Sequence, residues 1–198
     1  MSSSFFKIFI FSVSIVLTII FLIFIPIYYL KSSSINFQEY LNKYVEKYEL
    51  NGVFLWPAPG YTRITSGFGY RVAPASGAST YHSGIDIGAP TGTNIVSAFS
   101  GIVTFIGFKG AGGYTITITN SNFSASYCHV SPNFIVEIGQ NVQKGQIIGN
   151  VGPKYVYDVP NNPYKDKSGN PTNGATTGPH LHFTLRKDGN IVNPLDYL

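Results

Sequence analysis

The stretch 177–185, TGPHLHFTL, carries the pattern from which the fold and its chemistry can be worked out. Apolar and polar residues alternate from position 180 to 185, which is the period of a half-buried strand. His180 and His182 then leave the same face, about 6.6 Å apart along the strand. Two imidazoles beside the Gly178-Pro179 turn suit a metal centre in which one binds zinc and the other transfers protons. The alternative is a strand with two surface histidines, and the remaining histidines must decide.

The third histidine lies in the segment 81–90, YHSGIDIGAP. His82 and Asp86 are the residue types that bind zinc, but on a straight strand they would be about 13 Å apart. The glycines, the isoleucines and Pro90 argue against a helix. Gly84 allows the chain to bend between the two, and we expect that it does. The alternative for Asp86 is a turn or cap residue.

The fourth histidine, His129, follows an alternating strand, FSASYC at 123–128. It is either part of the same centre or a strand-end histidine that is hydrogen-bonded locally. All four histidines of the chain fall in these three motifs, which favours one shared centre. Cys128 is the only cysteine, so no disulfide forms within the chain. Because neighbouring strand residues point to opposite faces, we interpret Cys128 as a small buried residue and not as the partner of His129 in a Cys–His nucleophile.

Composition limits the classes of protein that come into question. The chain has 198 residues, enough for one ordinary domain and an appendage. Its net charge is +4, only 11% of its residues are charged, and no run of basic residues occurs. Nucleic acid is therefore a poor candidate partner.

The N-terminal region predicts a membrane anchor. Residues 8–30 contain no charge and lie between Lys7 and Lys31. Twenty-three residues in a helix span about 34 Å, enough to cross a bilayer core. No small-residue cleavage site follows, so a retained signal anchor is expected, with residues 1–7 as a cytoplasmic tail. The lysines on the two sides do not themselves favour this orientation.

Residues 31–53 are expected to form a stalk. Apolar residues recur at helical spacing in the segment 36–50, NFQEYLNKYVEKYEL, with glutamate and lysine between them, which indicates a short amphipathic helix. The WPAPG run at 56–60 ends this pattern. We place the start of the globular domain at residue 54 and its end at residue 198.

From residue 54 onward the pattern is that of a mainly β protein, with short apolar runs separated by Gly, Pro, Asn and Ser. The expected fold is a compact antiparallel β-sandwich or half-barrel. The polar segment 153–177 predicts a long loop that borders the cleft. The expected strands are 102–108, 114–119, 124–129, 146–151, 181–186 and 191–192.

Five segments, in order, carry a resemblance to a known family: 64–71 (ITSGFGYR), 82–87 (HSGIDI), 127–131 (YCHVS), 138–149 (IGQNVQKGQIIG) and 178–183 (GPHLHF). From residue 54 to 198 the sequence resembles the M23 zinc metallopeptidases of the lysostaphin or LytM type. The resemblance implies a LytM-like fold and cleavage of peptide bonds in bacterial peptidoglycan. It also implies that His82, Asp86 and His182 bind Zn²⁺, and that His180 and His129 flank the bound water.

Within that resemblance, we assign His180 as the general base and His129 as the partner of the developing oxyanion, although the sequence cannot separate the two roles. No H-E-x-x-H motif supplies a carboxylate base. The connection into the H-x-H strand is longer than in many relatives, which leaves the substrate preference open.

A second hypothesis is a non-catalytic M23-like scaffold, or a module that binds wall peptides within an envelope complex. Domains of that kind typically lack some metal or catalytic residues, whereas all five positions are filled here, which favours the enzyme. A cell-wall hydrolase needs its catalytic domain outside the membrane. We therefore expect a single-pass membrane protein with an extracytoplasmic domain. Its substrate would be peptidoglycan peptides, and protein partners are not predicted.

Overall fold

The computed structural model describes Glu39 and residues 54–74 and 77–198. The predicted tail, membrane span and stalk helix, at 1–7, 8–30 and 31–53, therefore lie outside the described residues apart from Glu39. Within the described part, no helix has the length and apolar character needed to cross a bilayer.

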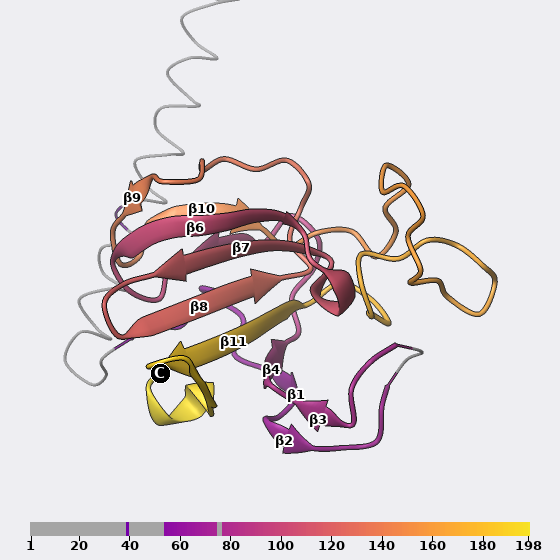
Figure 1. Cartoon of the computed structure of the whole chain (residues 1–198), viewed down its shortest axis with the longest axis horizontal. Coiled ribbons are helices and arrows are strands. Elements are labelled where there is room, and N and C mark those ends of the chain that lie inside the picture. The colour runs from indigo at the N-terminus through magenta and orange to yellow at the C-terminus, as the bar shows by residue number, and fades with distance from the viewer. Residues whose placement is uncertain (1–38, 40–53, 75–76) are drawn as a thin grey trace, which may run out of the picture. The chain divides into compact units, whose positions relative to one another are not determined.

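The main element is one antiparallel sheet of eight strands, whose central members lie side by side in Figure 1. In spatial order its strands are β1 (Ile64–Ser66), β4 (Gly84–Ile87), β11 (Leu181–Lys187), β8 (Phe123–Cys128), β7 (Tyr114–Thr119), β6 (Gly101–Phe108) and β9 (Asn141–Val142), with β12 (Asn190–Val192) also paired to β11.

Two smaller sheets and two short helices complete the described domain. The strand β5 (Asn94–Val96) pairs with β10 (Ile147–Asn150), and β2 (Gly69–Tyr70) pairs with β3 (Tyr81–His82). The 3-10 helices are η2 (Gly110–Gly112) and η3 (Pro194–Asp196). The prediction of a mainly β, antiparallel fold is confirmed, and all six expected strands form with ends that differ by one residue or less. The short strands β1 to β5 and β9 were not predicted.

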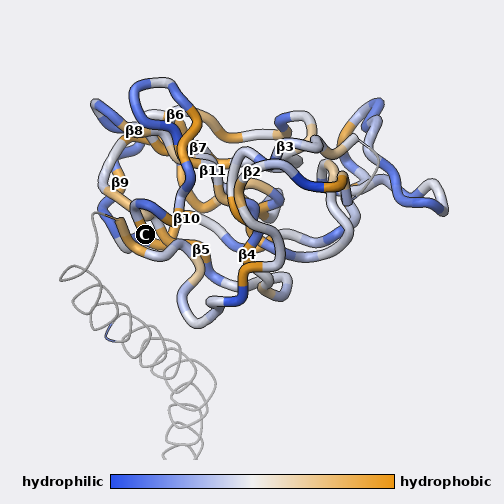
Figure 2. Tube along the Cα trace, turned by 90° about the horizontal axis from the view of Figure 1, so that it is seen from below, coloured by the Kyte–Doolittle hydropathy of each residue, from blue (hydrophilic) through white to orange (hydrophobic). Residues whose placement is uncertain are grey.

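One face of the large sheet forms the hydrophobic core. Ile116 and Ile118 of β7 and Phe183 of β11 are completely buried, and Ile95 and Ile148 of the β5–β10 pair belong to the same core cluster. Burying a side chain of this size stabilises the fold by about 1.5–3 kcal/mol. Hydrophobic residues accordingly concentrate in the strands, whereas most of the length of the projecting loops is hydrophilic (Figure 2). This core fixes the strands that carry the polar residues of the opposite face.

The opposite face of the same strands is polar. In β7, threonines alternate with the core isoleucines, and in β11, His182 and Thr184 alternate with the core residues. The side chains on this face include Asp86 of β4 and Ser126 of β8, which line the same cleft as His182 and Thr184. Because successive side chains of a strand point to opposite faces, each strand sends one set of side chains into the core and the other into the polar cleft.

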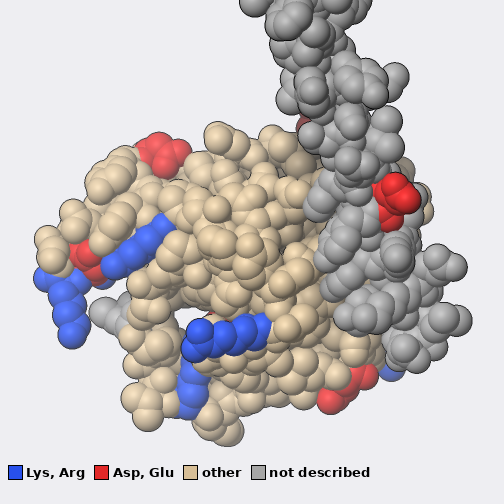
Figure 3. Space-filling view, turned by 180° about the vertical axis from the view of Figure 1, so that it is seen from behind, with Lys and Arg blue, Asp and Glu red and all other residues tan. Residues whose placement is uncertain are grey.

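Charged residues are sparse on the described surface. Figure 3 shows one face on which the Lys, Arg, Asp and Glu side chains are scattered between larger uncharged areas. This distribution follows from a sequence in which only 11% of residues are charged.

Candidate metal centre

Strand pairing places two of the predicted ligands opposite each other. The strands β4 and β11 are antiparallel, and their register makes Asp86 the direct partner of His182. Both side chains project from the polar face of the sheet, because their strand neighbours Ile85, Ile87 and Phe183 point into the core.

The third predicted ligand, His82, reaches the same point although it lies outside the large sheet, and the expected bend at Gly84 is absent because Gly84 is the first residue of the strand β4. His82 ends β3, which pairs with β2 and not with the large sheet. Gly84 lies against the backbone of β11, where an added Cβ would overlap the carbonyl of Phe183. Only glycine allows this close approach of β4 to β11, and the imidazole of His82 lies beside Asp86 two residues further along β4.

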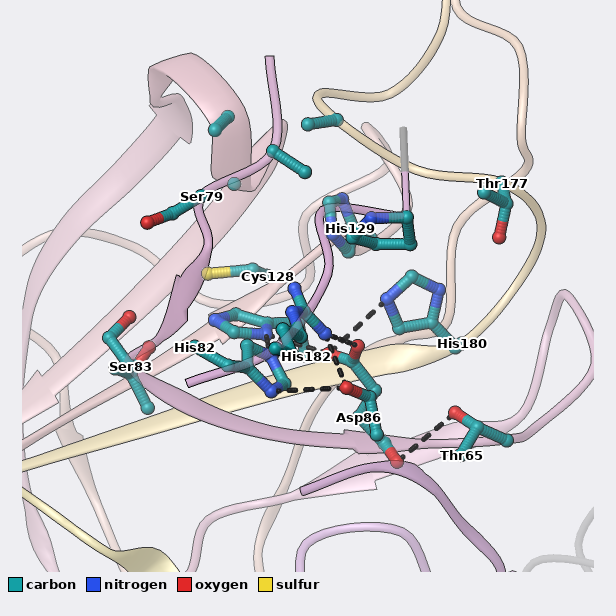
Figure 4. Close-up of a pocket in the computed structure, with 18 of the residues that line it drawn as sticks. Thr65, Ser79, His82, Ser83, Asp86, Cys128, His129, Thr177, His180 and His182 are labelled. Atoms are coloured by element: carbon teal, nitrogen blue, oxygen red, sulfur yellow. Dashed lines mark hydrogen bonds and ion pairs between the residues drawn. The ribbon is translucent and has the colours of Figure 1, made fainter. Parts of the chain in front are cut away.

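Three ligand atoms converge in the cleft (Figure 4). The Nε2 atom of His82 lies 3.1 Å from Oδ1 of Asp86 and 2.9 Å from Nδ1 of His182. The Nδ1 atom of His182 lies 2.7 Å from the same Oδ1 atom. Ligand atoms around a tetrahedral zinc ion would be about 3.3 Å apart, so an expansion of a few tenths of an ångström accommodates the ion.

The hydrogen bonds around the three ligands favour a cation between them. The Nδ1 atom of His82 lies 2.6 Å from the carbonyl oxygen of Gly67, which can only accept, so Nδ1 carries the proton. In the tautomer with its proton on Nδ1, the Nε2 atom is an acceptor that faces a carboxylate. Burial opposes ionisation of Asp86, but the neighbouring imidazoles of His180, His182 and His82 outweigh it and hold the pKa of this carboxyl well below its usual range. The donor set thus fits zinc.

Arg71 is a residue of the centre that sequence reasoning did not single out. Its Nη1 atom donates to Oδ2 of Asp86 at 3.1 Å and to the hydroxyl of Ser66. The guanidinium therefore holds the carboxylate oxygen that does not face the two histidines. Arg71 belongs to the ITSGFGYR segment, which was matched to the family, but nothing in the spacing of that segment indicates a contact with Asp86.

His180 lies beside the three ligands. Its Nε2 atom is 3.5 Å from Oδ1 of Asp86, and its Nδ1 atom donates to the carbonyl of Gly178 at 2.8 Å. Although alternation placed His180 within the strand, β11 begins at the next residue, and His180 lies in the turn that leads into it. In the tautomer with its proton on Nδ1, the ring presents its acceptor Nε2 towards the centre.

His129 completes the group of four histidines. Its ring centroid lies 4.6 Å from that of His180 and 6.1 Å from that of His182. Its Nδ1 atom donates to the carbonyl of Asn173 at 2.7 Å. Burial, together with the neighbouring His180 and His182 imidazoles, lowers the pKa of His129 to about 3. His129 is therefore neutral near pH 7.

The prediction that Cys128 and His129 point to opposite faces is wrong. Both side chains line the cleft, because β8 ends at Cys128 and His129 has a left-handed backbone with φ of 58°. Strict alternation does not extend past the end of a strand. Cys128 is nevertheless buried, and burial raises the pKa of its thiol to about 11. The thiol is thus protonated at neutral pH and is not an activated nucleophile.

The five predicted residues lie in one cleft of about 650 Å³. Its floor is the polar face of the sheet, and its walls include Lys109 and Gly112 near η2, and Ala175 and Thr177 at the end of the segment 153–177. Most of that segment, coloured orange in Figure 1, projects beyond the ends of the strands. The fold and the site define a mainly β protein with three side chains that could hold one metal ion beside two further imidazoles.

The chain belongs to peptidase family M23. The model of that family matches residues 80–163, which include His82, Asp86 and His129. His180 and His182 lie beyond the matched residues, and the fold brings them to the same centre.

Known relatives agree with this membership. The chain is 36% identical over 136 residues to the DD-carboxypeptidase/endopeptidase Mpg of Neisseria gonorrhoeae. The aligned residues cover 68% of this chain and 27% of that relative. The chain thus spans only about a quarter of the length of the first curated relatives that it matches.

Two solved structures resemble the fold. A zinc-containing peptidase from Vibrio cholerae aligns with a TM-score of 0.54 and 30% identity, over 70% of this chain and 37% of the other. A mutant of the catalytic domain of the prophage-encoded M23 protein EnpA from Enterococcus faecalis aligns with a TM-score of 0.50 and 31% identity. That alignment covers 69% of this chain and 90% of the other.

Proposed function

We propose that the chain is a zinc-dependent endopeptidase that hydrolyses peptide bonds in bacterial peptidoglycan. The observation that carries the proposal is the convergence of two imidazole nitrogens and one carboxylate oxygen within 3.1 Å, beside two further imidazoles. The names of the relatives support the reaction class, since they include DD-endopeptidases and a zinc-containing peptidase.

In the proposed site, His82, Asp86 and His182 hold the zinc ion. Zinc bound there would lower the pKa of a water molecule and polarise the scissile carbonyl. Arg71 keeps Asp86 oriented by donating to its other oxygen.

We assign proton transfer chiefly to His180, because its Nε2 atom lies 3.5 Å from the ligand oxygen of Asp86. His129 is neutral with its Nδ1–H already donated to Asn173, so its Nε2 atom accepts hydrogen bonds. It suits the role of holding the attacking water, and it could donate to an oxyanion only after taking up a proton. This departs from the oxyanion role expected for His129 from the sequence.

The test uses the purified chain, loaded with zinc, on peptidoglycans with different cross-bridges, with fragments weighed by mass spectrometry. We expect one zinc per chain and cleavage of peptide bonds, and no cleavage by His182→Ala. Protein that binds one zinc and wall fragments but releases no peptide from any preparation would overturn the enzyme and favour the scaffold hypothesis.

We further propose that residues 8–30 anchor the chain in the cell membrane, with residues 1–7 in the cytoplasm, residues 31–53 as a stalk and the domain 54–198 outside. The uncharged length of the segment and the extracytoplasmic location of the proposed substrate support this arrangement. External protease should degrade the domain on intact protoplasts. Complete protection of the domain would contradict the proposal.

A further inference from the structure

We infer that Asn173, in the long segment 153–177, is a positioning residue that fixes the orientation and tautomer of His129. The role of His129 in hydrolysis rests on the proposed function, but the positioning itself can be measured without it. The inference starts from the hydrogen bond in which the Nδ1 atom of His129 donates to the main-chain carbonyl of Asn173 at 2.7 Å.

Asn173 is completely buried, and its polar groups form hydrogen bonds with different parts of the chain. Its main-chain N–H donates to the carbonyl of Lys154 at 2.9 Å. Its side-chain Oδ1 accepts from the N–H of Tyr114 at 2.7 Å, and its Nδ2 donates to the carbonyl of Val130 at 3.0 Å. The side chain thus ties the segment to the start of β7 and to the residue that follows His129.

The space around this junction leaves little room for the Asn173 carbonyl to move. Gly113, with φ of 63°, passes so close that an added Cβ would overlap both the main-chain and side-chain oxygens of Asn173. Gly174 packs equally closely against the backbone of Ala111 and Gly113. The two glycines therefore allow the segment to pack closely on the η2 loop, where the side-chain hydrogen bonds of Asn173 hold it.

His129 needs such a partner because it lies outside the strand ladder. With φ of 58° it has left β8, and its own N–H donates to the carbonyl of Gly112 at 2.8 Å. This bond fixes the backbone but not the rotation of the ring. The carbonyl of Asn173 fixes the ring, because only the Nδ1–H tautomer can donate to it.

The two catalytic candidates differ in how their rings are held. The carbonyl that holds His180 comes from Gly178, two residues earlier in the same turn. The carbonyl that holds His129 comes from Asn173, 44 residues away in sequence. The long segment thus contributes to the centre, because it supplies the carbonyl that accepts from the ring of His129.

A pair of matched asparagine variants tests this role in the zinc-loaded chain. Asn173→Ala removes the bonds to Tyr114 and Val130 and so frees the carbonyl that holds His129. Asn162→Ala is the control: Asn162 lies in the same segment, is buried, donates to the carbonyl of Thr172 at 2.8 Å and accepts from the N–H of Tyr164 at 3.0 Å. No described contact joins Asn162 to His129.

The decisive readout is ¹⁵N NMR of the imidazole rings, which is simple because the chain has only four histidines. His129, assigned with His129→Gln, should show a slowly exchanging Nδ1–H and an unprotonated Nε2 in the native chain and in Asn162→Ala. In Asn173→Ala the Nδ1–H should exchange rapidly, with the two tautomers averaged. An unchanged His129 signature in Asn173→Ala, or an equal change in Asn162→Ala, would overturn the inference.

Kinetics give a second readout. Asn173→Ala should lower kcat about 10- to 100-fold with little change in KM, and Asn162→Ala should leave both nearly unchanged. If Asn173→Ala does not fold, Asn173→Asp serves instead: it keeps an acceptor for Tyr114 but sets an oxygen against the carbonyl of Val130, so the His129 signature should change in the same direction. A native chain that cleaves nothing would refute the proposed function, while the NMR comparison would still decide the role of Asn173.

Discussion

Asp86 and His182 are direct register partners on β4 and β11, and their ligand atoms Oδ1 and Nδ1 lie 2.7 Å apart although 96 residues separate them in sequence. A register shift of one residue would turn either side chain to the opposite face of the sheet. The metal centre therefore depends on the same pairing that builds the core. Changes to the ligands and changes to the pairing should have separable effects.

Replacing a ligand should separate metal binding from proton transfer. We expect His182→Ala to lose stoichiometric zinc and all activity, because it removes one of the three proposed protein ligands. His180→Ala should keep one zinc per chain and lose activity by at least about 10²-fold. Zinc content by atomic absorption and hydrolysis rates measure the two effects. Loss of zinc in His180→Ala would show that His180 is a ligand and contradict the proposed division.

Replacing Arg71 should weaken zinc binding by releasing Asp86. Arg71→Lys keeps the positive charge but cannot reproduce the bonds of the guanidinium, so it isolates the effect of orientation. We expect zinc affinity to fall about 10-fold or more, measured by competition with a chromophoric chelator. Arg63→Lys is the control, because the exposed side chain of Arg63 has no described contact with Asp86. Equal affinities of Arg71→Lys and the native chain would contradict this account.

Adding a methyl group at Gly84 should destabilise the fold. Its Cβ would overlap the Phe183 carbonyl, so β4 and β11 would have to separate. We expect Gly84→Ala to lower the free energy of unfolding by about 1–3 kcal/mol or more, measured with urea. Gly67→Ala is the comparison, because a Cβ there meets no atom within 4 Å. Similar stabilities of the two variants would show that the close approach at Gly84 is not required.

Acid should destabilise the metal-free protein. The folded chain keeps His129 neutral down to about pH 3, whereas the unfolded chain takes up this proton near the ordinary pKa of 6.5. The unfolded state binds more protons in this window, so stability falls as the pH decreases, by about 1.4 kcal/mol per pH unit for one proton. The lowered pKa of Asp86 acts in the same direction below its ordinary value of 3.8.

The measurement is a series of urea unfolding curves between pH 7 and pH 4, after removal of metal with a chelator. His129→Gln should reduce the slope of stability against pH by about 1.4 kcal/mol per unit, because it removes one of the protons that only the unfolded state binds. A variant slope equal to the native slope would mean that His129 is not held neutral by the fold.

Local patterns predicted the longer strands but not the shorter ones. The strands β6, β7, β8 and β11 have six to eight residues each, enough to show alternation. The strands β2, β3 and β9 have two residues each, and they exist only because a partner strand lies beside them. A pair of residues carries no period, so tertiary contacts alone define these elements.

The sequence by itself determined which residue types meet. Imidazole and carboxylate groups are donors that zinc accepts, and they stand out in the sequence as the H-x-H pair and the H-x-x-x-D spacing. Only the tertiary structure decided what surrounds them. The partners of Arg71 and His129 are a carboxylate on another strand and a backbone carbonyl 44 residues away. Every residue has a main-chain carbonyl, so the residue type does not indicate which carbonyl will accept the hydrogen bond from His129. The folded chain selects that carbonyl by its position.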